Sequence, residues 1–331
     1  MNIREQTESL ELKNFAPDAC LSKNSRGREE FEEPCDFRTC FQRDRDRIIH
    51  CKAFRRLKHK TQVFLSPEGD HYRTRLTHTL EVSQIARSIA RGMRLNEDLA
   101  EAAALGHDLG HTPFGHAGER ALNEVSSCGF KHYEQSVRTA QRLEKNGKGL
   151  NLTYEVTDAI MCHTNLVAST LEGRIIEVAD KIAYINHDID DAINAKIIKP
   201  SDLPKKAIDV LGNSTSRRIS TLISALVMDE TRSLKMPKDI EESYHTLHSY
   251  MYETVYSSPI AKSEEGKATD IIKYLYSYFL SNPEKMPELY KGIMEKEGIE
   301  RAVCDYIAGM SDNYAINYYE ELVIPKSWSV L

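Results

Sequence analysis

The sequence predicts an all-α fold with one small β-hairpin, and three observations lead to this prediction. Apolar residues recur at helical spacing through most of the chain. Residues 97–109 are rich in alanine, which is a strong helix former. Only residues 62–65 and 71–73 have the pattern of two short strands, and the turn residues 66–70 separate them.

The pattern divides the chain into three regions. Residues 1–38 carry many charges and little periodicity, and we expect an irregular amino-terminal arm. Residues 39–200 form the expected core, with helices predicted over residues 39–60, 76–93, 97–109, 132–145, 154–161 and 171–198. Residues 110–118 cannot form one regular helix, because a proline and glycines interrupt them. Residues 201–331 are expected to form further helices that pack on the core.

Composition excludes several classes of protein. The chain has 331 residues, enough for a buried core, and its longest apolar stretch, residues 219–228, covers about half of a membrane span. The first residues lack the apolar centre of a signal peptide. Seven cysteines without a C-x-x-C pair argue against a disulfide framework and a zinc ribbon. We therefore expect a soluble, cytoplasmic protein with no membrane partner.

Charge is unevenly distributed along the chain, whose net charge is −6. Two aspartates, Asp44 and Asp46, oppose a basic cluster that consists of Arg43, Arg45, Arg47, Lys52, Arg55, Arg56, Lys58 and Lys60. A local positive field in an acidic protein implies a specific anionic ligand. A solvated helix face is the alternative.

Four residues could hold a metal ion. His107 and Asp108 end the alanine-rich helix, where two consecutive side chains can flank one ion. His78 lies in an apolar run of the preceding helix, and Asp180 lies inside an otherwise apolar helix. Burying that carboxylate without a cation would cost several kcal/mol, and a salt bridge to an arginine is the alternative. Imidazole and carboxylate ligands suit Mn, Fe, Ni, Zn or Mg, with open positions for water and substrate.

The order of these residues is the H…HD…D order of the HD superfamily of metal-dependent phosphohydrolases. The chain resembles one branch of it, the deoxyguanosinetriphosphate triphosphohydrolase (dGTPase)-like proteins, from about Ser25 through Asp191. The segments that carry this resemblance are residues 41–49, 53–58, 60–63, 73–80, 105–119 and 180–191, with a further match at 305–311. The resemblance implies an HD-domain helical fold.

The resemblance also implies a reaction, the cleavage of a deoxynucleoside triphosphate at its α-phosphorus into deoxynucleoside and tripolyphosphate. A bound metal would polarise the phosphate and acidify water. His116 and Glu119, spaced i, i+3, would hydrogen-bond each other and position water or protonate the leaving oxygen. A helix cap or a core histidine is the alternative for His116. His111 is a further catalytic candidate that could equally support the metal ligands.

Phosphate contacts are expected from two cations near the metal residues. Arg75 lies one helical turn before His78, and Lys181 directly follows Asp180. Both match phosphate-contacting positions of the family. Either could instead be an ordinary salt-bridge partner.

The deoxyribose is expected to lie along one helix. Tyr184 and Asp188 follow Asp180 at i+4 and i+8, which puts them on one stripe. The resemblance assigns Asp188 and Gln62 to the 3′-hydroxyl, with Tyr184 and Val63 packing on the sugar. Base-reading residues are expected in the carboxyl-terminal half, among the tyrosines around Tyr244 to Tyr256, and the sequence singles out none of them.

Two other functions compete with this one. The first is an HD phosphohydrolase that acts on a nucleoside monophosphate or a signalling nucleotide. The second is a non-catalytic nucleic-acid-binding protein that uses the basic cluster, whose binding would weaken steeply with salt. The resemblance further implies a homo-oligomer, a hexamer or tetramer. The sequence is compatible with a nucleotide effector but does not decide it, and the basic cluster is compatible with weak single-strand binding.

Overall fold

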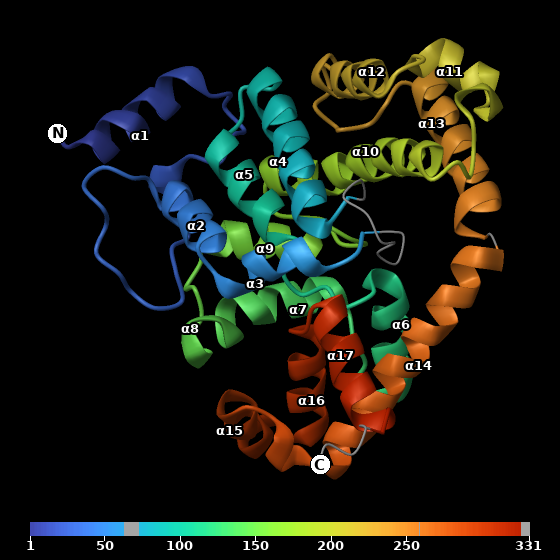
Figure 1. The fold of residues 1–331 in the computed structure, drawn as a ribbon. Helices are drawn as coiled ribbons and strands as arrows, with labels where there is room; N and C mark the ends of the chain where they lie inside the picture. The colour runs from blue at the N-terminus through green and yellow to red at the C-terminus, as the bar shows by residue number, and fades with distance from the viewer. Residues whose placement is uncertain (63–72, 258, 326–331) are drawn as a thin grey trace, which may run out of the picture.

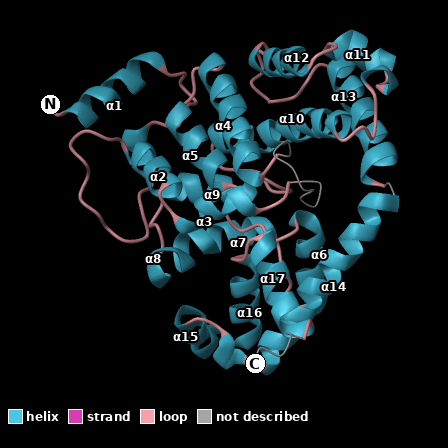
Figure 2. Cartoon of the chain, viewed as in Figure 1, coloured by secondary structure: helices cyan, strands magenta, loops and turns pink. Residues whose placement is uncertain are grey.

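The chain folds mainly into helices joined by loops (Figure 2). The computed structural model describes residues 1–62, 73–257 and 259–325. Within these ranges there is no strand, which confirms the all-α class, and Thr61 and Thr74 form an isolated antiparallel bridge. The predicted hairpin falls mainly on residues 63–72, outside the described residues. No described helix is long and apolar enough to cross a membrane.

The amino-terminal half contains the helices α1 (Ile3–Asn14), α2 (Cys40–Ile49), α3 (Lys52–Arg56), α4 (Arg75–Gly92), α5 (Glu97–Gly106), α6 (Gly115–Val125), α7 (His132–Arg138), α8 (Glu144–Gly147) and α9 (Tyr154–Cys162). The remainder contains α10 (Leu171–Asn194), α11 (Lys205–Leu211), α12 (Thr215–Val227), α13 (Lys238–Met251), α14 (Pro259–Ser281), α15 (Glu288–Glu297), α16 (Ile299–Ala308) and α17 (Asp312–Val323).

The centre of the molecule is formed by α4, α5, α9 and α10 (Figure 1). Helix α4 packs against α5 and α10, and α5 packs against α9. Small side chains at Ala100, Ala103 and Ala104 are fully buried and allow the helices to approach closely. Isoleucines such as Ile85 and Ile182 fill the space between them. This packing fixes the helix faces that carry the expected metal ligands.

The carboxyl-terminal helices form a second apolar cluster. Helix α14 packs on α6, α16 and α17, and Figure 1 shows α15–α17 on the opposite side of the core from α11 and α12. Asp312 ties this cluster to the core, because its carboxylate accepts from the backbone N–H groups of Thr61 at 2.8 Å and Phe114 at 2.9 Å. The buried Lys60 ammonium donates to the carbonyl oxygens of His111 and Ala308.

The first 38 residues are more ordered than the sequence indicates. Helix α1 begins at a capping box, in which Asn2 and Glu5 each accept from the other's backbone N–H. Glu11 is the one buried residue of this helix, so the helix has no buried apolar stripe. Apolar periodicity therefore could not predict it. The expectation of an irregular arm is therefore wrong for residues 3–14.

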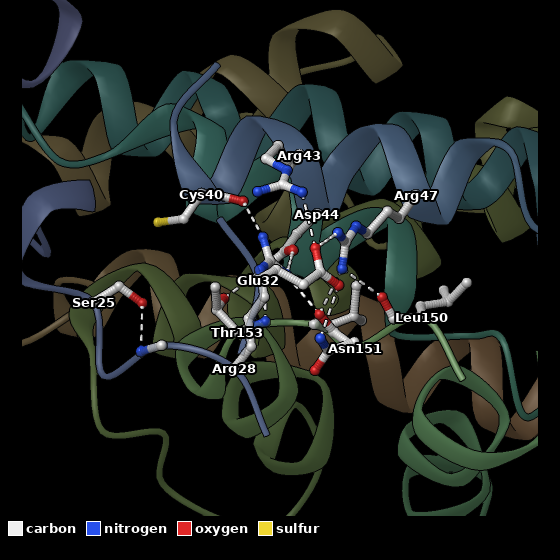
Figure 3. A network of polar contacts seen from close by, with 12 residues as sticks. Ser25, Arg28, Glu32, Cys40, Arg43, Asp44, Arg47, Leu150, Asn151 and Thr153 are labelled. Atoms are coloured by element: carbon white, nitrogen blue, oxygen red, sulfur yellow. Dashed lines mark hydrogen bonds and ion pairs between the residues drawn. The ribbon is translucent and has the colours of Figure 1, made fainter. Parts of the chain in front are cut away.

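The segment before α2 is held to the core by charges (Figure 3). Arg28 pairs with the fully buried Asp44 and donates to the carbonyl oxygen of Asn151 at 2.6 Å. Glu32 accepts from Arg43 at 2.8 Å and from Arg47. Much of the basic cluster is therefore neutralised internally.

Two predicted helices differ in extent. The helix expected over residues 39–60 breaks after Ile49, because Cys51 caps a new helix through its sulfur, which accepts from the N–H of Phe54 at 3.3 Å. The long helix expected to reach residue 198 ends at Asn194. Neither difference moves a predicted metal ligand.

Candidate functional site

The four predicted metal ligands meet where α4, the end of α5 and α10 come together. Nε2 of His78 lies 2.9 Å from Oδ1 of Asp180, and Nε2 of His107 lies 3.4 Å from Oδ1 of Asp108 and 4.0 Å from Oδ1 of Asp180. Ligand atoms of His78, His107 and Asp108 all lie within 4.8 Å of one another. Among the described residues, the ion-pair partners of Asp180 are these histidines, and no arginine is among them.

The imidazole ring of His107 is oriented so that its Nε2 is available to bind a metal ion. It follows the last residue of α5, and its Nδ1 donates to the carbonyl oxygen of Ala104 at 2.6 Å. Because a carbonyl only accepts, Nδ1 carries the proton and Nε2 presents its lone pair. Within the described part of the chain, this buried Nε2 has no hydrogen-bond partner.

Both carboxylates are held in the ionised form. Burial raises the pKa of Asp108, but His107 and Arg75 outweigh burial and hold this pKa well below its usual range. Burial likewise raises the pKa of Asp180, and the hydrogen bond from His78 brings it below its usual range. Nη1 of Arg75 donates to Oδ2 of Asp108 at 2.7 Å. Two ionised carboxylates together with imidazole nitrogens form a suitable ligand set for a divalent cation.

The predicted partner residues His116 and Glu119 lie at the start of α6. Nδ1 of His116 lies 3.2 Å from Oε2 of Glu119, which confirms that the two can hydrogen-bond. Burial raises the pKa of Glu119, but the hydrogen bonds from His116 and His132 hold it far below its usual range. Glu119 is therefore anionic and orients a half-exposed imidazole.

Two glycines shape the loop that carries these side chains. A Cβ on Gly110 would lie 2.1 Å from the backbone nitrogen of Ser136 in α7, and one on Gly118 would lie 2.1 Å from the carbonyl oxygen of Pro113. At both glycines the main chain packs directly against another main-chain segment, which leaves no room for a side chain. This close packing places the start of α6 beside the predicted metal ligands.

His132 and His163, which no sequence pattern singles out, also line the cavity of the site. Nδ1 of His132 lies 2.9 Å from Oε1 of Glu119, and the Nε2 atoms of the two histidines lie 3.1 Å apart. The ring of His132 stacks on that of His111 with centroids 4.2 Å apart. Their only signal in the sequence is a histidine beside an apolar helical run, which is typical of many core histidines.

A cavity of about 260 Å³ is lined by predicted metal ligands and by the neighbouring histidines. Besides the metal and histidine residues, its lining includes Gln62, Arg75, Glu177, Lys181, Tyr184, Tyr244 and His248. Lys181 is exposed and its Nζ lies 2.6 Å from Oε1 of Glu177. The amide oxygen of Gln62 is buried and lacks a hydrogen-bond partner among the described residues.

Asp188 lies deeper in the molecule than the cavity lining. It accepts a hydrogen bond from Tyr256, and burial raises its pKa to about 8. Its Oδ1 is buried without a hydrogen-bond partner in the described residues. Val63 falls outside the described residues.

Comparison with known proteins identifies the family. The HD domain model matches residues 75–185, and the phosphohydrolase-associated domain model matches residues 234–321. A deoxyguanosinetriphosphate triphosphohydrolase-like protein of Caldanaerobacter subterraneus is 56% identical, covering 99% of this chain and 98% of that protein. Proteins of the same name from Clostridium perfringens (49% identical, covering 98% and 99%) and Clostridium tetani (46%, covering 98% and 97%) are also similar. The chain therefore belongs to the deoxyguanosinetriphosphate triphosphohydrolase-like family of HD-domain phosphohydrolases.

Proposed function

We propose that this protein is a metal-dependent triphosphohydrolase that converts deoxynucleoside triphosphates into deoxynucleosides and tripolyphosphate. One observation carries the proposal more than any other. His78, Asp108, Asp180 and His116 line one cavity. His107 lies beside it, with its ligand atom within 4.8 Å of those of His78 and Asp108, and His116 is hydrogen-bonded to the anionic Glu119. Metal ligands and an acid–base pair beside one cavity support hydrolysis of a phosphate ester.

The residues present fit a divalent cation. The bare, buried Nε2 of His107 is costly unless it meets a cation or a donor, and the two ionised carboxylates supply negative charge. When bound there, such an ion supplies charge stabilisation to a phosphate and acidifies water. Mn and Mg are the ions to test first, because both prefer oxygen-containing sets with open positions.

His116 is the proposed acid–base residue. Its Nδ1 is engaged by Glu119, so Nε2 is the atom that can accept a proton from water or donate one to the leaving 5′-oxygen. Water attacks the α-phosphorus, the bond from phosphorus to the 5′-oxygen breaks, and the 5′-oxygen gains a proton. His111 lies between this pair and Asp108, with its Nε2 3.5 Å from Oδ1 of Asp108, and is proposed to contact the α-phosphate.

Phosphate and sugar contacts are proposed for six residues: Arg75, Lys181, Gln62, Val63, Tyr184 and Asp188. Cavity-lining positions support four of them, and the unsatisfied amide oxygen of Gln62 supports a hydroxyl contact. Arg75 already binds Asp108, so its phosphate contact would use its remaining N–H groups. For Asp188 to contact the 3′-hydroxyl, its buried Oδ1 would have to become accessible when the substrate binds.

The alternative enzyme is an HD phosphohydrolase for another nucleotide. The nucleic-acid-binding alternative is weakened because Arg43, Arg45 and Arg47 pair with acidic residues of the same chain. We also propose that the enzyme forms a homo-oligomer, as the family resemblance implies.

The test is incubation with each of the four deoxynucleoside triphosphates and Mn²⁺ or Mg²⁺, with anion chromatography of the products. Tripolyphosphate from at least one substrate supports the proposal. Release of pyrophosphate or phosphate, or turnover of monophosphates only, supports the alternative enzyme.

A further inference from the structure

We propose that Asp312, the first residue of α17, is a positioning residue that holds His116 and Gln62 in place in the cavity. The side chain of Asp312 is buried at the boundary between the carboxyl-terminal helices and the core. His116 and Gln62 belong to two other segments of the chain, and both line the cavity. One carboxylate thus makes the geometry of the site depend on the carboxyl-terminal helices.

The first contact of Asp312 is with the loop that precedes α6. Its Oδ1 accepts from the backbone N–H of Phe114 at 2.9 Å. Phe114 is the N-cap residue of α6, and His116 is the second residue of that helix. A carboxylate at the N-terminus of a helix is also favoured by the helix dipole. Asp312 therefore fixes where α6 begins, and with it the position of His116.

Phe114 depends on this contact because its backbone lies in the left-handed region, with φ of 62° and ψ of 22°. A residue with a side chain keeps that conformation only where its surroundings enforce it. The ring of Phe114 is buried in the apolar cluster formed mainly by α14 and α16, and Asp312 holds its N–H. Loss of this hydrogen bond would let the backbone relax and shift the start of α6.

The second contact of Asp312 is with the segment that precedes α4. Its Oδ2 accepts from the backbone N–H of Thr61 at 2.8 Å and also from the hydroxyl of Thr61. Gln62 is the next residue, and its buried amide oxygen is the proposed contact for the 3′-hydroxyl. The two oxygens of one carboxylate thus hold the acid–base segment and the sugar-binding segment at a fixed separation.

Lys60 makes a parallel connection one residue earlier. Its ammonium donates to the carbonyl oxygen of His111, in the loop before α6, and at 2.7 Å to that of Ala308, the last residue of α16. Asp312 holds the other end of the same loop at Phe114. Both ends of the loop are therefore attached to the turn between α16 and α17.

A purely structural role is the alternative, and Asp44 provides the comparison. Its Oδ2 accepts from the backbone N–H of Thr153 at 2.9 Å and from the hydroxyl at 2.6 Å, the same pair of donors that Thr61 offers to Asp312. Asp44 is buried as well, but Asp44 and Thr153 lie outside the cavity lining. Asp44→Asn is therefore a matched control for Asp312→Asn.

This inference rests on the proposed function for its consequence, but the contact can be tested without any reaction. Asp312→Asn has one oxygen and one NH₂ group, so it can accept from Phe114 or from Thr61 but not from both. Hydrogen–deuterium exchange of the Mn²⁺-loaded full chain should rise by about 10-fold in the loop before α6 or in the segment around Thr61, the effect of one lost hydrogen bond on local opening. Unchanged exchange in both segments, or an equal rise throughout the chain, would overturn the proposal.

The control variant should respond elsewhere. Asp44→Asn should raise exchange near Thr153 and leave the two segments of the site unchanged. If Asp312→Asn does not fold, Thr61→Val replaces it, with Thr153→Val as its control. Thr61→Val should raise the KM for dGTP more than it lowers kcat, because it loosens the Gln62 segment. A KM equal to that of Thr153→Val would count against the proposal.

Kinetics separate positioning from a loss of folded protein. Asp312→Asn should lower kcat for dGTP by about 10- to 100-fold, because a misplacement of about 1 Å can cost about 100-fold in rate. Made in His116→Ala, the same substitution should have almost no further effect, since no imidazole remains to be positioned. An equal loss in both backgrounds would make Asp312 a structural residue. The expected exchange pattern in a chain without dGTP turnover would uphold the positioning and refute the proposed function.

Discussion

Nε2 of His78 lies 2.9 Å from Oδ1 of Asp180, and this contact joins α4 to α10 at the base of the cavity. Burial lowers the pKa of His78, but the hydrogen bond to Asp180 outweighs it and raises that pKa above its usual range. The same contact lowers the pKa of Asp180. Without metal the two form an ion pair, and a bound cation must displace the proton of His78.

The first prediction concerns metal uptake. Asp180→Ala should hold at least one Mn²⁺ fewer per chain than the wild type, because it removes a carboxylate ligand and its negative charge. In the wild type, the affinity for Mn²⁺ should fall as the pH decreases through the raised pKa of His78, since protons compete with metal. Titration calorimetry at several pH values measures both effects. Full stoichiometry in the variant would remove Asp180 from the ligand set.

The second prediction concerns the acid–base pair. His116→Ala should keep its metal and lose activity by about 100- to 10,000-fold, the usual contribution of a general acid–base group. Glu119→Gln should shift the pH profile of kcat as well, because the amide cannot stabilise a charged imidazole. His59→Ala, which alters a histidine outside the cavity lining, is the matched control. Near wild-type turnover by His116→Ala would make His116 a structural residue.

The third prediction concerns the sugar. The enzyme should hydrolyse dGTP and reject GTP, because a packed wall at C2′ combines a clash with an unpaired hydroxyl. Asp188→Ala should weaken dGTP turnover without loss of metal, since Asp188 lies two turns beyond Asp180 in α10. Steady-state turnover of the paired substrates is the measurement. Equal wild-type rates on GTP and dGTP would return the protein to the other HD phosphohydrolases.

The fourth prediction concerns stability and pH. Burial raises the pKa of Asp188 to about 8, so the folded chain keeps a proton that the unfolded chain releases near pH 4. Folding therefore binds a proton between these values, and the free energy of unfolding should fall as pH rises from 5 to 8, by up to about 1.4 kcal/mol per pH unit from this group. Above pH 8 its contribution is constant.

Asp188→Asn removes this titration while keeping an oxygen that can accept from Tyr256. Urea unfolding of metal-free wild type and variant, measured from pH 5 to pH 8, should show a smaller loss of stability in the variant. Identical pH dependence in the two proteins would mean that Asp188 is ionised in the folded state.

The helices that carry the proposed metal ligands could be predicted because their apolar periodicity reflects burial. His78, His107 and Asp180 lie on faces that pack into the centre, and a polar residue on such a face is noticeable in the sequence. The i, i+3 contact between His116 and Glu119 follows from helix geometry alone.

Other features depended on contacts between distant segments, and local patterns could not reveal them. His132 and His163 enter the site because α7 packs against α9, and neither helix has a periodicity that marks the residue. The basic cluster suggested a free positive surface, but Glu32 lies against it from the preceding segment. Helix α1 has no buried apolar stripe, so its caps, rather than periodicity, define it.

The most direct test of the proposed reaction is hydrolysis of dGTP in water enriched in ¹⁸O, with ³¹P nuclear magnetic resonance and mass spectrometry of both products. Attack at the α-phosphorus puts one ¹⁸O atom into tripolyphosphate and none into deoxyguanosine, and we predict this result for the Mn²⁺-loaded wild type. Release of pyrophosphate or phosphate, or ¹⁸O in the 5′-hydroxyl of deoxyguanosine, would contradict the proposed reaction.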